Sequence, residues 1–265
     1  MPLILRLSAL LLGLAILLVA CGDSTSVKTP VIRPVAGLPA QFGDTDPHPW
    51  RGRAPKTYPV HGVDVARYQN AVDWKRAAAN GIRFSYVKAT EGGDRVDPNF
   101  KTNWNASARA GIPRGAYHFF YFCRPAIEQA EWFIRNVPRT KGALPPVLDI
   151  EWNHTSPTCR LHPPADQVRA EMRIFLRALH QHYGQKPLIY TTVDFYHQND
   201  LAQLRGHEFW LRSVAAHPSK IYPGAKWTFW QYTGSGLAPG FGGEVDLNAF
   251  HGSEAEWKNW LATHR

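Results

Sequence analysis

The sequence predicts an α/β fold of the barrel type, in which parallel strands alternate with helices. From residue 60 onward, short apolar runs alternate with amphipathic stretches that stop at Gly or Asn, the pattern of parallel strands joined by helices. A polar or acidic residue follows the apolar run at the end of most of these strands. In a parallel barrel the carboxyl ends of the strands meet on one face, where active sites of this architecture lie.

The first part of the folded region contains five strands that are each followed by a helix. The strands are expected at residues 61–65, 82–88, 113–120, 145–150 and 187–192. The helices are expected at residues 71–79, 97–110, 125–136 and 165–183, with a weak helix after Asp194. The helix at 165–183 carries apolar residues at spacings of three and four. The helix at 97–110 starts at Asp97-Pro98 and is stopped by Gly111. Residues 90–93 are expected as a loop.

The regular alternation stops after the fifth helix. Three more strands are expected at residues 208–211, 227–232 and 244–247, joined by loops without convincing helices. A last amphipathic helix is expected at about residues 254–263.

The N-terminus has the pattern of an export signal. Residues 1–20 contain Arg6 and then an apolar stretch, which is typical of a secretory signal peptide. The sequence Leu18-Val19-Ala20-Cys21 resembles the bacterial lipobox, so Cys21 is expected to carry a lipid. Ordinary cleavage nearby or an uncleaved anchor are the alternatives, and each also exports the domain. Residues 22–59 are Pro-rich and are expected to form an extended linker without chemistry, which leaves residues 60–265 as the folded domain.

Composition limits the classes of partner. The formal charge of +9 and the pI near 9.6 favour an anionic polymer or a membrane surface. No zinc spacing, RNP-type strand or dense Lys/Arg tract is present, so no nucleic-acid partner is expected. The ten Trp residues exceed the usual need of a core, and aromatic rings are surfaces on which pyranose rings stack. The His residues lack ligand spacing, so neither a metal nor a cofactor is expected.

Two carboxylates stand at the end of the most apolar strand. The segment Pro145-Pro146-Val147-Leu148-Asp149-Ile150-Glu151-Trp152 places Asp149 and Glu151 on one face, because strand side chains alternate. Like charges held this close raise the pKa of one member, which leaves a protonated acid beside an ionised base. Glycoside hydrolysis needs this pair. The alternative is two solvated acids where a strand frays, but the apolar run and the following aromatic favour the first interpretation.

The order and spacing of several short motifs resemble the glycoside hydrolase family 25 lysozymes, the Chalaropsis-type muramidases. The resemblance covers about residues 60–250. Its motifs are Gly62-Val63-Asp64-Val65-Ala66-Arg67-Tyr68-Gln69, Val72-Asp73-Trp74, Val87-Lys88-Ala89-Thr90-Glu91-Gly92, Gly115-Ala116-Tyr117-His118-Phe119, Leu148-Asp149-Ile150-Glu151, Ile189-Tyr190-Thr191, Trp230-Gln231-Tyr232 and Val245-Asp246-Leu247-Asn248. It implies an irregular barrel of five β/α units followed by three strands, (β/α)5(β)3. It also implies cleavage of the β-1,4 bond between N-acetylmuramic acid and N-acetylglucosamine in peptidoglycan.

The resemblance assigns roles to individual residues. It implies that Glu151 is the general acid with Asp149 as its partner, and that Asp64 and Asp246 line the same site. Ala66 stands where the family often has Ser, and we attach no functional weight to this difference. The expected substrate-binding side chains are Tyr117, Trp152, Tyr190, Gln231 and Tyr232, and Trp230 is a further candidate. Aromatic residues at strand ends belong to the core or rim nearly as often. His118 is expected to be a hydrogen-bonded residue near the core, since the family does not use it.

The two remaining cysteines follow neighbouring strands. Cys123 comes after the third strand and Cys159 after the fourth, on the same face of the barrel. An exported compartment permits oxidation, so a disulfide beside the site is expected, and two free buried thiols are the alternative.

Three functions remain open at this point. The first is an exported, lipid-anchored, monomeric muramidase of the bacterial cell envelope that acts on peptidoglycan glycan strands. The second is a wall-binding lipoprotein without turnover, against which the four intact acids argue. The third is a hydrolase of another N-acetylated glycan such as chitin. The family-18 chitinase pattern argues against it, since that pattern places more Asp residues before its acid than Val147-Leu148 allows. For the reaction itself, we hypothesise that Glu151 protonates the leaving oxygen while ionised Asp149 supports attack by the substrate's own acetamido group.

Overall fold

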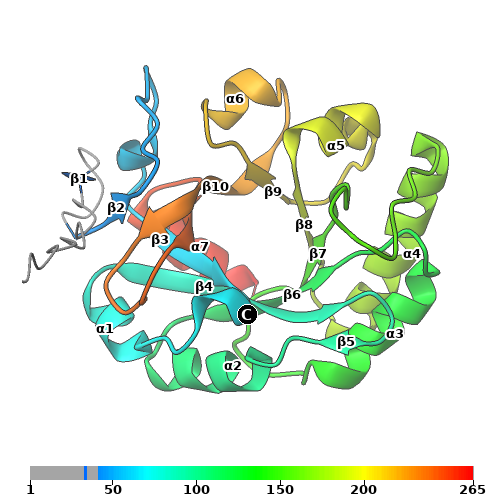
Figure 1. The fold of residues 1–265 in the computed structure, drawn as a ribbon, viewed down its shortest axis with the longest axis horizontal. Coiled ribbons are helices and arrows are strands. Elements are labelled where there is room, and N and C mark those ends of the chain that lie inside the picture. Colours follow the sequence, from blue (N-terminus) through cyan, green and yellow to red (C-terminus); the bar gives the residue numbers. More distant parts are fainter. Residues whose placement is uncertain (1–32, 35–40, 265) are drawn as a thin grey trace, which may run out of the picture. The chain divides into compact units, whose positions relative to one another are not determined.

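The computed structural model describes residues 33–34 and 41–264 of the 265-residue chain. Its centre is a closed barrel of eight strands (Figure 1). The barrel strands are β3 (His61–Val65), β4 (Ile82–Glu91), β6 (Arg114–Phe119), β7 (Val147–Asp149), β8 (Leu188–Thr191), β9 (Phe209–Arg212), β10 (Trp227–Leu237) and β11 (Val245–Phe250). All neighbours from β3 to β10 pair in parallel, and β11 closes the ring by pairing antiparallel with both β10 and β3. The α/β barrel predicted from the sequence is confirmed.

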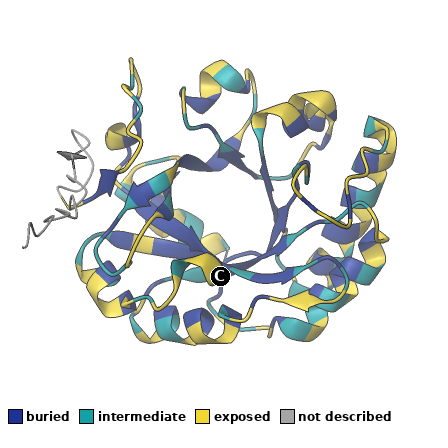
Figure 2. Cartoon of the chain, viewed as in Figure 1, coloured by how far each residue is buried: buried dark blue, intermediate teal, exposed yellow. Residues whose placement is uncertain are grey.

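Helices cover the outside of the first five strands. The helix that follows each of them is α1 (Trp74–Ala79), α2 (Phe100–Arg109), α3 (Ala126–Asn136), α4 (Ala165–Tyr183) or α5 (Val193–Gln198). Only the four-residue α6 (Pro218–Ile221) separates β9 from β10, and α7 (Glu254–Thr263) follows β11. The 3-10 turns are η1 (Pro55–Thr57), η2 (Arg67–Gln69) and η3 (Leu201–Gln203). Figure 2 shows the usual consequence, with buried strands and exposed outer faces of the helices.

Local sequence explains where these helices begin and end. The Asp73 carboxylate accepts a hydrogen bond from the backbone N–H of Arg76 at 3.0 Å and caps α1. Ser253 and Glu256 form a reciprocal capping box at the start of α7. Helix α4 ends at Gly184, whose positive φ of 74° suits glycine.

The loop expected at residues 90–93 begins later than predicted. Strand β4 continues to Glu91, because Thr90 and Glu91 pair with Val96 and Arg95 of the short strand β5 (Arg95–Val96). The prediction for Thr90 and Glu91 was therefore wrong, since it ended the strand where the apolar run ends and ignored the partner that follows in the chain.

The barrel interior is filled with aromatic side chains at the end that α7 covers. Phe84 and Tyr86 point inward, and they fit because Gly62 and Gly115 on the neighbouring strands have no side chain. A Cβ at Gly62 would lie 2.5 Å from the Phe84 ring, so the glycine is required by the close approach. Helix α7 closes this end with Trp257, whose ring centroid lies 5.4 Å from that of Phe84. The chemistry must therefore lie at the other end.

The folded domain begins before residue 60, which corrects the predicted linker boundary. Phe42 is 1% exposed, and the Tyr58 hydroxyl forms a 2.8 Å hydrogen bond with Nε2 of His217. Strand β2 (Gly43–Asp44) pairs with the far end of β10 and also with β1 (Arg33–Pro34). Phe42 and Tyr58 stand outside any periodic apolar pattern, so this segment carries no helix or strand signal. Both nevertheless pack into the hydrophobic core of the barrel domain. The predicted signal peptide and Cys21 lie outside the described residues.

Candidate active site

A cavity of about 720 Å³ opens at the carboxyl ends of the parallel strands. Its lining combines carboxylates, bases and aromatic rings. The residues that line it are Asp64, Ala66, Arg67, Tyr68, Gln69, Lys88, Glu91, Arg95, Tyr117, Phe119, Tyr121, Asp149, Glu151, Asn153, Thr155, Ser156, Pro157, Tyr190, Thr192, Trp210, Arg212, Gln231 and Asp246.

Strand alternation explains why polar groups gather at this end. Asp64 lies two residues beyond Gly62, and Asp149 lies two residues beyond Val147, so each carboxylate follows an inward-facing core residue on the same face. Strand β11 runs the opposite way, and its register places Asp246 opposite Asp64. The first residues of β11 therefore reach the same opening as the last residues of its neighbours.

Four acids meet in the cavity, and we call Asp64, Asp149, Glu151 and Asp246 the acid quartet. Asp64 is 6% exposed, and its Oδ2 accepts hydrogen bonds from Gln231 Nε2 at 3.0 Å and Asn248 Nδ2 at 2.8 Å. Burial raises the pKa of Asp64 to about 6, although these hydrogen bonds lower it. Burial and the neighbouring Asp64 carboxylate hold the pKa of Asp246 well above its usual range. Asp246 therefore holds its proton more tightly than an isolated aspartic acid does.

Asp149 and Glu151 share the inner wall of the same cavity. Burial raises the pKa of Glu151 to about 7, against the opposing effect of the Arg212 guanidinium. Burial and the Glu151 carboxylate raise the pKa of Asp149 well above its usual range. Within the described part of the chain, Oδ1 of Asp149 is buried and has no hydrogen-bond partner. A carboxyl group that is half protonated near neutral pH suits proton transfer, and a free acceptor oxygen suits a donor on a ligand.

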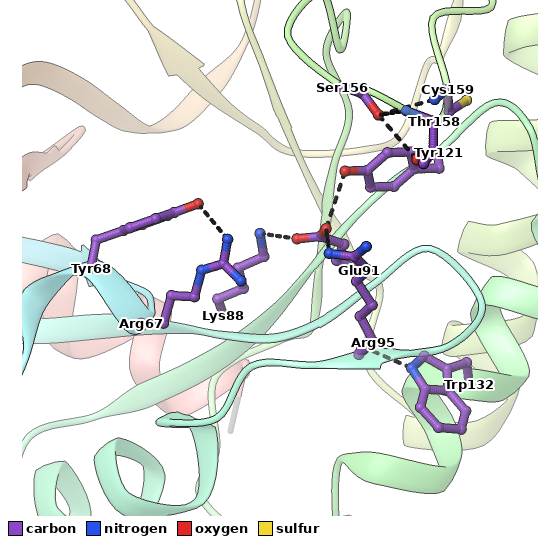
Figure 3. Close-up of polar contacts among 10 residues, drawn as sticks. All are labelled: Arg67, Tyr68, Lys88, Glu91, Arg95, Tyr121, Trp132, Ser156, Thr158 and Cys159. Atoms are coloured by element: carbon purple, nitrogen blue, oxygen red, sulfur yellow. Dashed lines mark hydrogen bonds and ion pairs between the residues drawn. The ribbon is translucent and has the colours of Figure 1, made fainter.

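Basic residues that the sequence analysis did not assign to the site lie beside the quartet. Lys88 Nζ lies 2.7 Å from Glu91 Oε2, and Arg95 Nη1 lies 3.9 Å from Glu91 Oε1 (Figure 3). The Tyr121 hydroxyl donates a 3.1 Å hydrogen bond to the same carboxylate. Arg212 enters from the end of β9. Its signal was the apolar run Phe209-Trp210-Leu211 that ends in a charged residue, as in the strands already singled out.

Of the five predicted aromatic residues, two line the cavity and three do not. Tyr117 and Tyr190 are among its lining residues, and the Tyr190 hydroxyl donates to Gln231 Oε1 at 2.8 Å. Trp152 instead packs outside the cavity, stacked on His162 with ring centroids 4.1 Å apart. Tyr232 is 2% exposed and donates its hydroxyl to Nδ1 of His61 at 3.1 Å.

Trp152 and Tyr232 lie outside the cavity for the same reason. Each residue directly follows one that faces the cavity, Glu151 or Gln231, so chain alternation turns the next side chain away. Trp230 likewise lies outside the cavity and is fully buried.

His118 is a buried hydrogen-bonded residue, as expected. Its Nε2 donates to Gln129 Oε1 at 3.1 Å, and its Nδ1 accepts from the Thr90 hydroxyl at 2.7 Å. Burial lowers the pKa of His118 to about 4, so the ring is neutral at physiological pH.

A disulfide fixes the loop that forms one rim of the cavity. Cys123 and Cys159 are bonded, with Cα atoms 5.7 Å apart. The loop before Cys159 supplies Asn153, Thr155 and Ser156 to the lining. The disulfide therefore ties this rim to the segment that follows β6.

Searches for other kinds of site and anchor concern the described residues alone. Among them, no group of three or more His, Cys, Asp or Glu side chains is arranged to hold a metal ion. None of the helices between residues 41 and 264 has the length and apolar character needed to cross a membrane.

Comparisons with known proteins agree with the fold. The sequence model of the glycosyl hydrolases family 25 matches residues 63–241. Lysozyme M1 of Streptomyces globisporus is 33% identical over 213 residues, which are 74% of this chain and 69% of that protein. The uncharacterized protein YegX of Escherichia coli strain K12 is 37% identical over 212 residues, covering 77% of this chain and 74% of the relative.

A solved structure gives the same result in three dimensions. The structure of a family 25 glycosyl hydrolase from Bacillus anthracis superposes with a TM-score of 0.71 and 37% identity. The match covers 81% of this chain and 98% of the other. The part of the chain that precedes residue 63, and Asp246, lie outside the match to the family model.

Proposed function

This chain belongs to family 25 of the glycosyl hydrolases and is a lysozyme-type glycoside hydrolase, and we propose that it cleaves the β-1,4 bond between N-acetylmuramic acid and N-acetylglucosamine in peptidoglycan. The observation that supports the proposal most is the environment of Glu151. Its carboxyl group has a pKa of about 7, lies beside Asp149, and faces a cavity large enough for sugar rings. A proton donor at neutral pH is what cleavage of a glycosidic bond requires.

The first step uses Glu151 as the general acid. Its carboxyl group gives a proton to the glycosidic oxygen while the bond from that oxygen to the anomeric carbon breaks. The carbonyl oxygen of the neighbouring 2-acetamido group forms a bond to the same carbon, which produces a positively charged five-membered ring. No bond to a side chain forms in this scheme.

Asp149 supports that charged ring. Its partner-free Oδ1 accepts the acetamido N–H, and the ionised carboxylate stabilises the positive charge that develops. Burial favours the protonated form of Asp149 in the free protein, while the cationic ring and nearby Lys88 favour the ionised form. Water then attacks the anomeric carbon, and the bond from that carbon to the acetamido oxygen breaks, which returns the neutral acetamido group. The water gives its proton to the Glu151 carboxylate, so the acid is restored, and the two displacements together retain the configuration.

The remaining members of the quartet and their neighbours hold the sugar. Asp64 is fixed by Gln231 and Asn248, and Tyr190 is fixed by Gln231, so the four side chains form one rigid polar network. Such a network suits orientation of hydroxyl and acetamido groups, because its side chains do not need to be ordered when substrate binds.

Fragments released from purified peptidoglycan test the bond that is cut. Mass spectrometry after borohydride reduction should find muramitol derivatives, since N-acetylmuramic acid becomes the new reducing end. Fragments that end in reduced N-acetylglucosamine would make the protein a glucosaminidase. Release of chitin oligosaccharides at a comparable kcat/KM would favour the broader glycan specificity.

Two substitutions test the division of work. Glu151→Gln should lower kcat by about 10²- to 10⁴-fold, which leaves almost no cleavage. Glycan binding should stay intact, since only proton donation is lost. Asp149→Asn should also be slow, by about 10²- to 10³-fold, because the developing cation loses its support. A glycosyl ester trapped on Asp149 would contradict the proposal, since Asp149 would then be the nucleophile.

We also propose that the protein works as a monomeric lipoprotein of the cell envelope. The lipobox-like residues before Cys21 and the following Pro-rich segment support an anchor, and the charge of +9 suits an anionic wall.

A further inference from the structure

Three basic side chains form one side of the catalytic cavity, and we call Arg67, Lys88 and Arg95 the basic wall. All three also line an adjoining pocket of about 380 Å³, which shares them and Glu91 with the cavity. Figure 3 shows Lys88 between Arg67 and Glu91, with the Arg95 guanidinium beside Glu91. The basic wall thus lies where the catalytic cavity continues into a side pocket.

The acids near the basic wall leave two guanidinium groups largely unpaired. Glu91 is held by Lys88 at 2.7 Å, and it lies only at the limit of contact with Arg95, 3.9 Å away. Asp94 pairs with Arg124 at 2.9 Å. The described residues provide no carboxylate that forms an ion pair with Arg67, whose Nη2 donates to the Tyr68 hydroxyl at 3.2 Å.

One further acid, Asp97, is engaged by the backbone. It is 7% exposed, its Oδ2 accepts from the Arg67 N–H at 2.8 Å, and its Oδ1 accepts from the Asn99 N–H at 2.9 Å. These bonds hold its carboxylate below the surface, so Arg67 and Arg95 supply the free donors on the open side.

The same contacts hold the two arginines in place. The Arg67 backbone is tied to Asp97, and its guanidinium carbon lies 5.0 Å from the centre of the Tyr68 ring. The Arg95 carbonyl accepts a 2.9 Å hydrogen bond from Trp132 Nε1, which fixes the short β4–β5 hairpin to α3. Because little backbone ordering remains to be done, binding of an anion there is less costly in entropy.

The raised pKa values of the acid quartet reduce the negative charge that an anion meets in the rest of the cavity. The loop before Cys159 contributes the uncharged side chains of Asn153, Thr155 and Ser156 to the same cavity. Burial raises the pKa values of Asp149 and Asp246 well above their usual range, which favours the uncharged form of both carboxyl groups. A carboxylate on a bound glycan can therefore approach Arg67 and Arg95, and the guanidinium fork matches its two oxygens.

We propose that Arg67 and Arg95 bind a carboxylate carried by the muramic acid unit of the substrate, either the lactyl group itself or the attached stem peptide. This inference rests on the proposed function and adds its specificity: carboxylate-bearing glycans bind tightly and neutral N-acetylated glycans bind weakly. The two arginines position the substrate and take no part in the chemistry.

Calorimetric binding to the full-length chain in detergent tests the proposal in a Glu151→Gln background, where turnover is removed. The probes are a muramyl tetrasaccharide with stem peptides, the same glycan without peptides and with free lactyl carboxylates, and neutral chitotetraose. Arg67→Ala and Arg95→Ala should each weaken binding of a carboxylate probe about fivefold, and the double variant about twentyfold. Binding of chitotetraose should stay within about twofold.

A matched control is available on α3. Arg135 forms an i,i+4 ion pair with Glu131 at 3.7 Å, as Arg95 does with Glu91. Its guanidinium lies over the Trp132 ring, as that of Arg67 lies over Tyr68, but Arg135 does not line the cavity. Arg135→Ala should leave all three affinities unchanged. The variants Arg67→Lys and Arg95→Lys should recover part of the affinity, because they keep the charge and lose the fork.

The outcomes separate the sources of carboxylate and the two proposals. Weaker binding of the peptide-bearing probe alone assigns the stem peptide, and weaker binding of the denuded glycan assigns the lactyl group. Equal losses on chitotetraose, or no loss on either carboxylate probe, would overturn the inference. If the wild-type chain fails to cleave peptidoglycan while arginine-dependent binding persists, the proposed reaction fails and the carboxylate site stands.

Discussion

The alkaline side of the pH–activity profile should report the proton on Glu151. Burial raises the pKa of this carboxyl group from 4.5 to about 7. At pH 7 about half of the molecules therefore carry the catalytic proton, whereas about 0.3% would carry it at the ordinary pKa. The environment of Glu151 thus provides about 150-fold more of the active form at pH 7, equivalent to about 3 kcal/mol. Activity should be high below the pKa and lost as the pH rises through it.

The assay is kcat/KM on a soluble glycan between about pH 4 and 9, which reports groups of the free enzyme. Above about pH 7 the logarithm of kcat/KM should fall with a slope of about one. Two substitutions should move this limb in opposite directions. Arg212→Gln should move it to higher pH, because the Arg212 charge lowers the pKa of Glu151, and Asp194→Asn should move it to lower pH.

A distant charge provides the control for these shifts. Arg83 pairs with Glu254 at 3.2 Å and does not line the cavity, so Arg83→Gln should leave the limb in place. A limb near pH 4.5, expected of an unperturbed glutamate, would refute the reasoning, as would shifts of the same sign for Arg212→Gln and Asp194→Asn.

Three further predictions concern stability and location. Since the native state holds the Glu151 proton more tightly than the unfolded chain does, the unfolding free energy falls as the pH rises from about 4.5 to 7. Glu151→Gln should therefore raise the unfolding free energy at pH 7 by up to about 3 kcal/mol and leave it unchanged below about pH 4, and denaturant titrations at both pH values measure this difference. Replacing Cys123 and Cys159 by Ser opens a 36-residue loop and should cost about 4 kcal/mol, and an unchanged thermal midpoint would contradict a structural role. Cys21→Ser should move the protein from the membrane fraction to the soluble fraction on centrifugation, and retention with an uncleaved signal region would indicate a helical anchor.

Sequence alone was sufficient wherever the relevant physics is local. The period of two along a strand put Asp149 and Glu151 on one face, and the rule that parallel strands end on one side of a barrel placed Asp64 with them. The disulfide between Cys123 and Cys159 followed from two loops that leave neighbouring strands. Strong apolar periodicity also gave the bounds of α4 directly.

Tertiary structure decided everything that depends on which neighbour lies across space. Alternation shows that Glu151 and Trp152 point to opposite sides of the strand, but it does not show which side faces the cavity. Only the closed barrel shows that Glu151 lines the cavity and that Trp152 packs on His162 outside it. The packing of Phe42 on the barrel and the pairing of β4 with β5 involve partners without a periodic signal of their own. Burial raises the pKa of Glu151. The Arg67 guanidinium forms no ion pair with a carboxylate of the described residues and donates to the Tyr68 hydroxyl instead. Burial and long-range proximity are properties of the packed chain, and no local pattern of residues encodes them by itself.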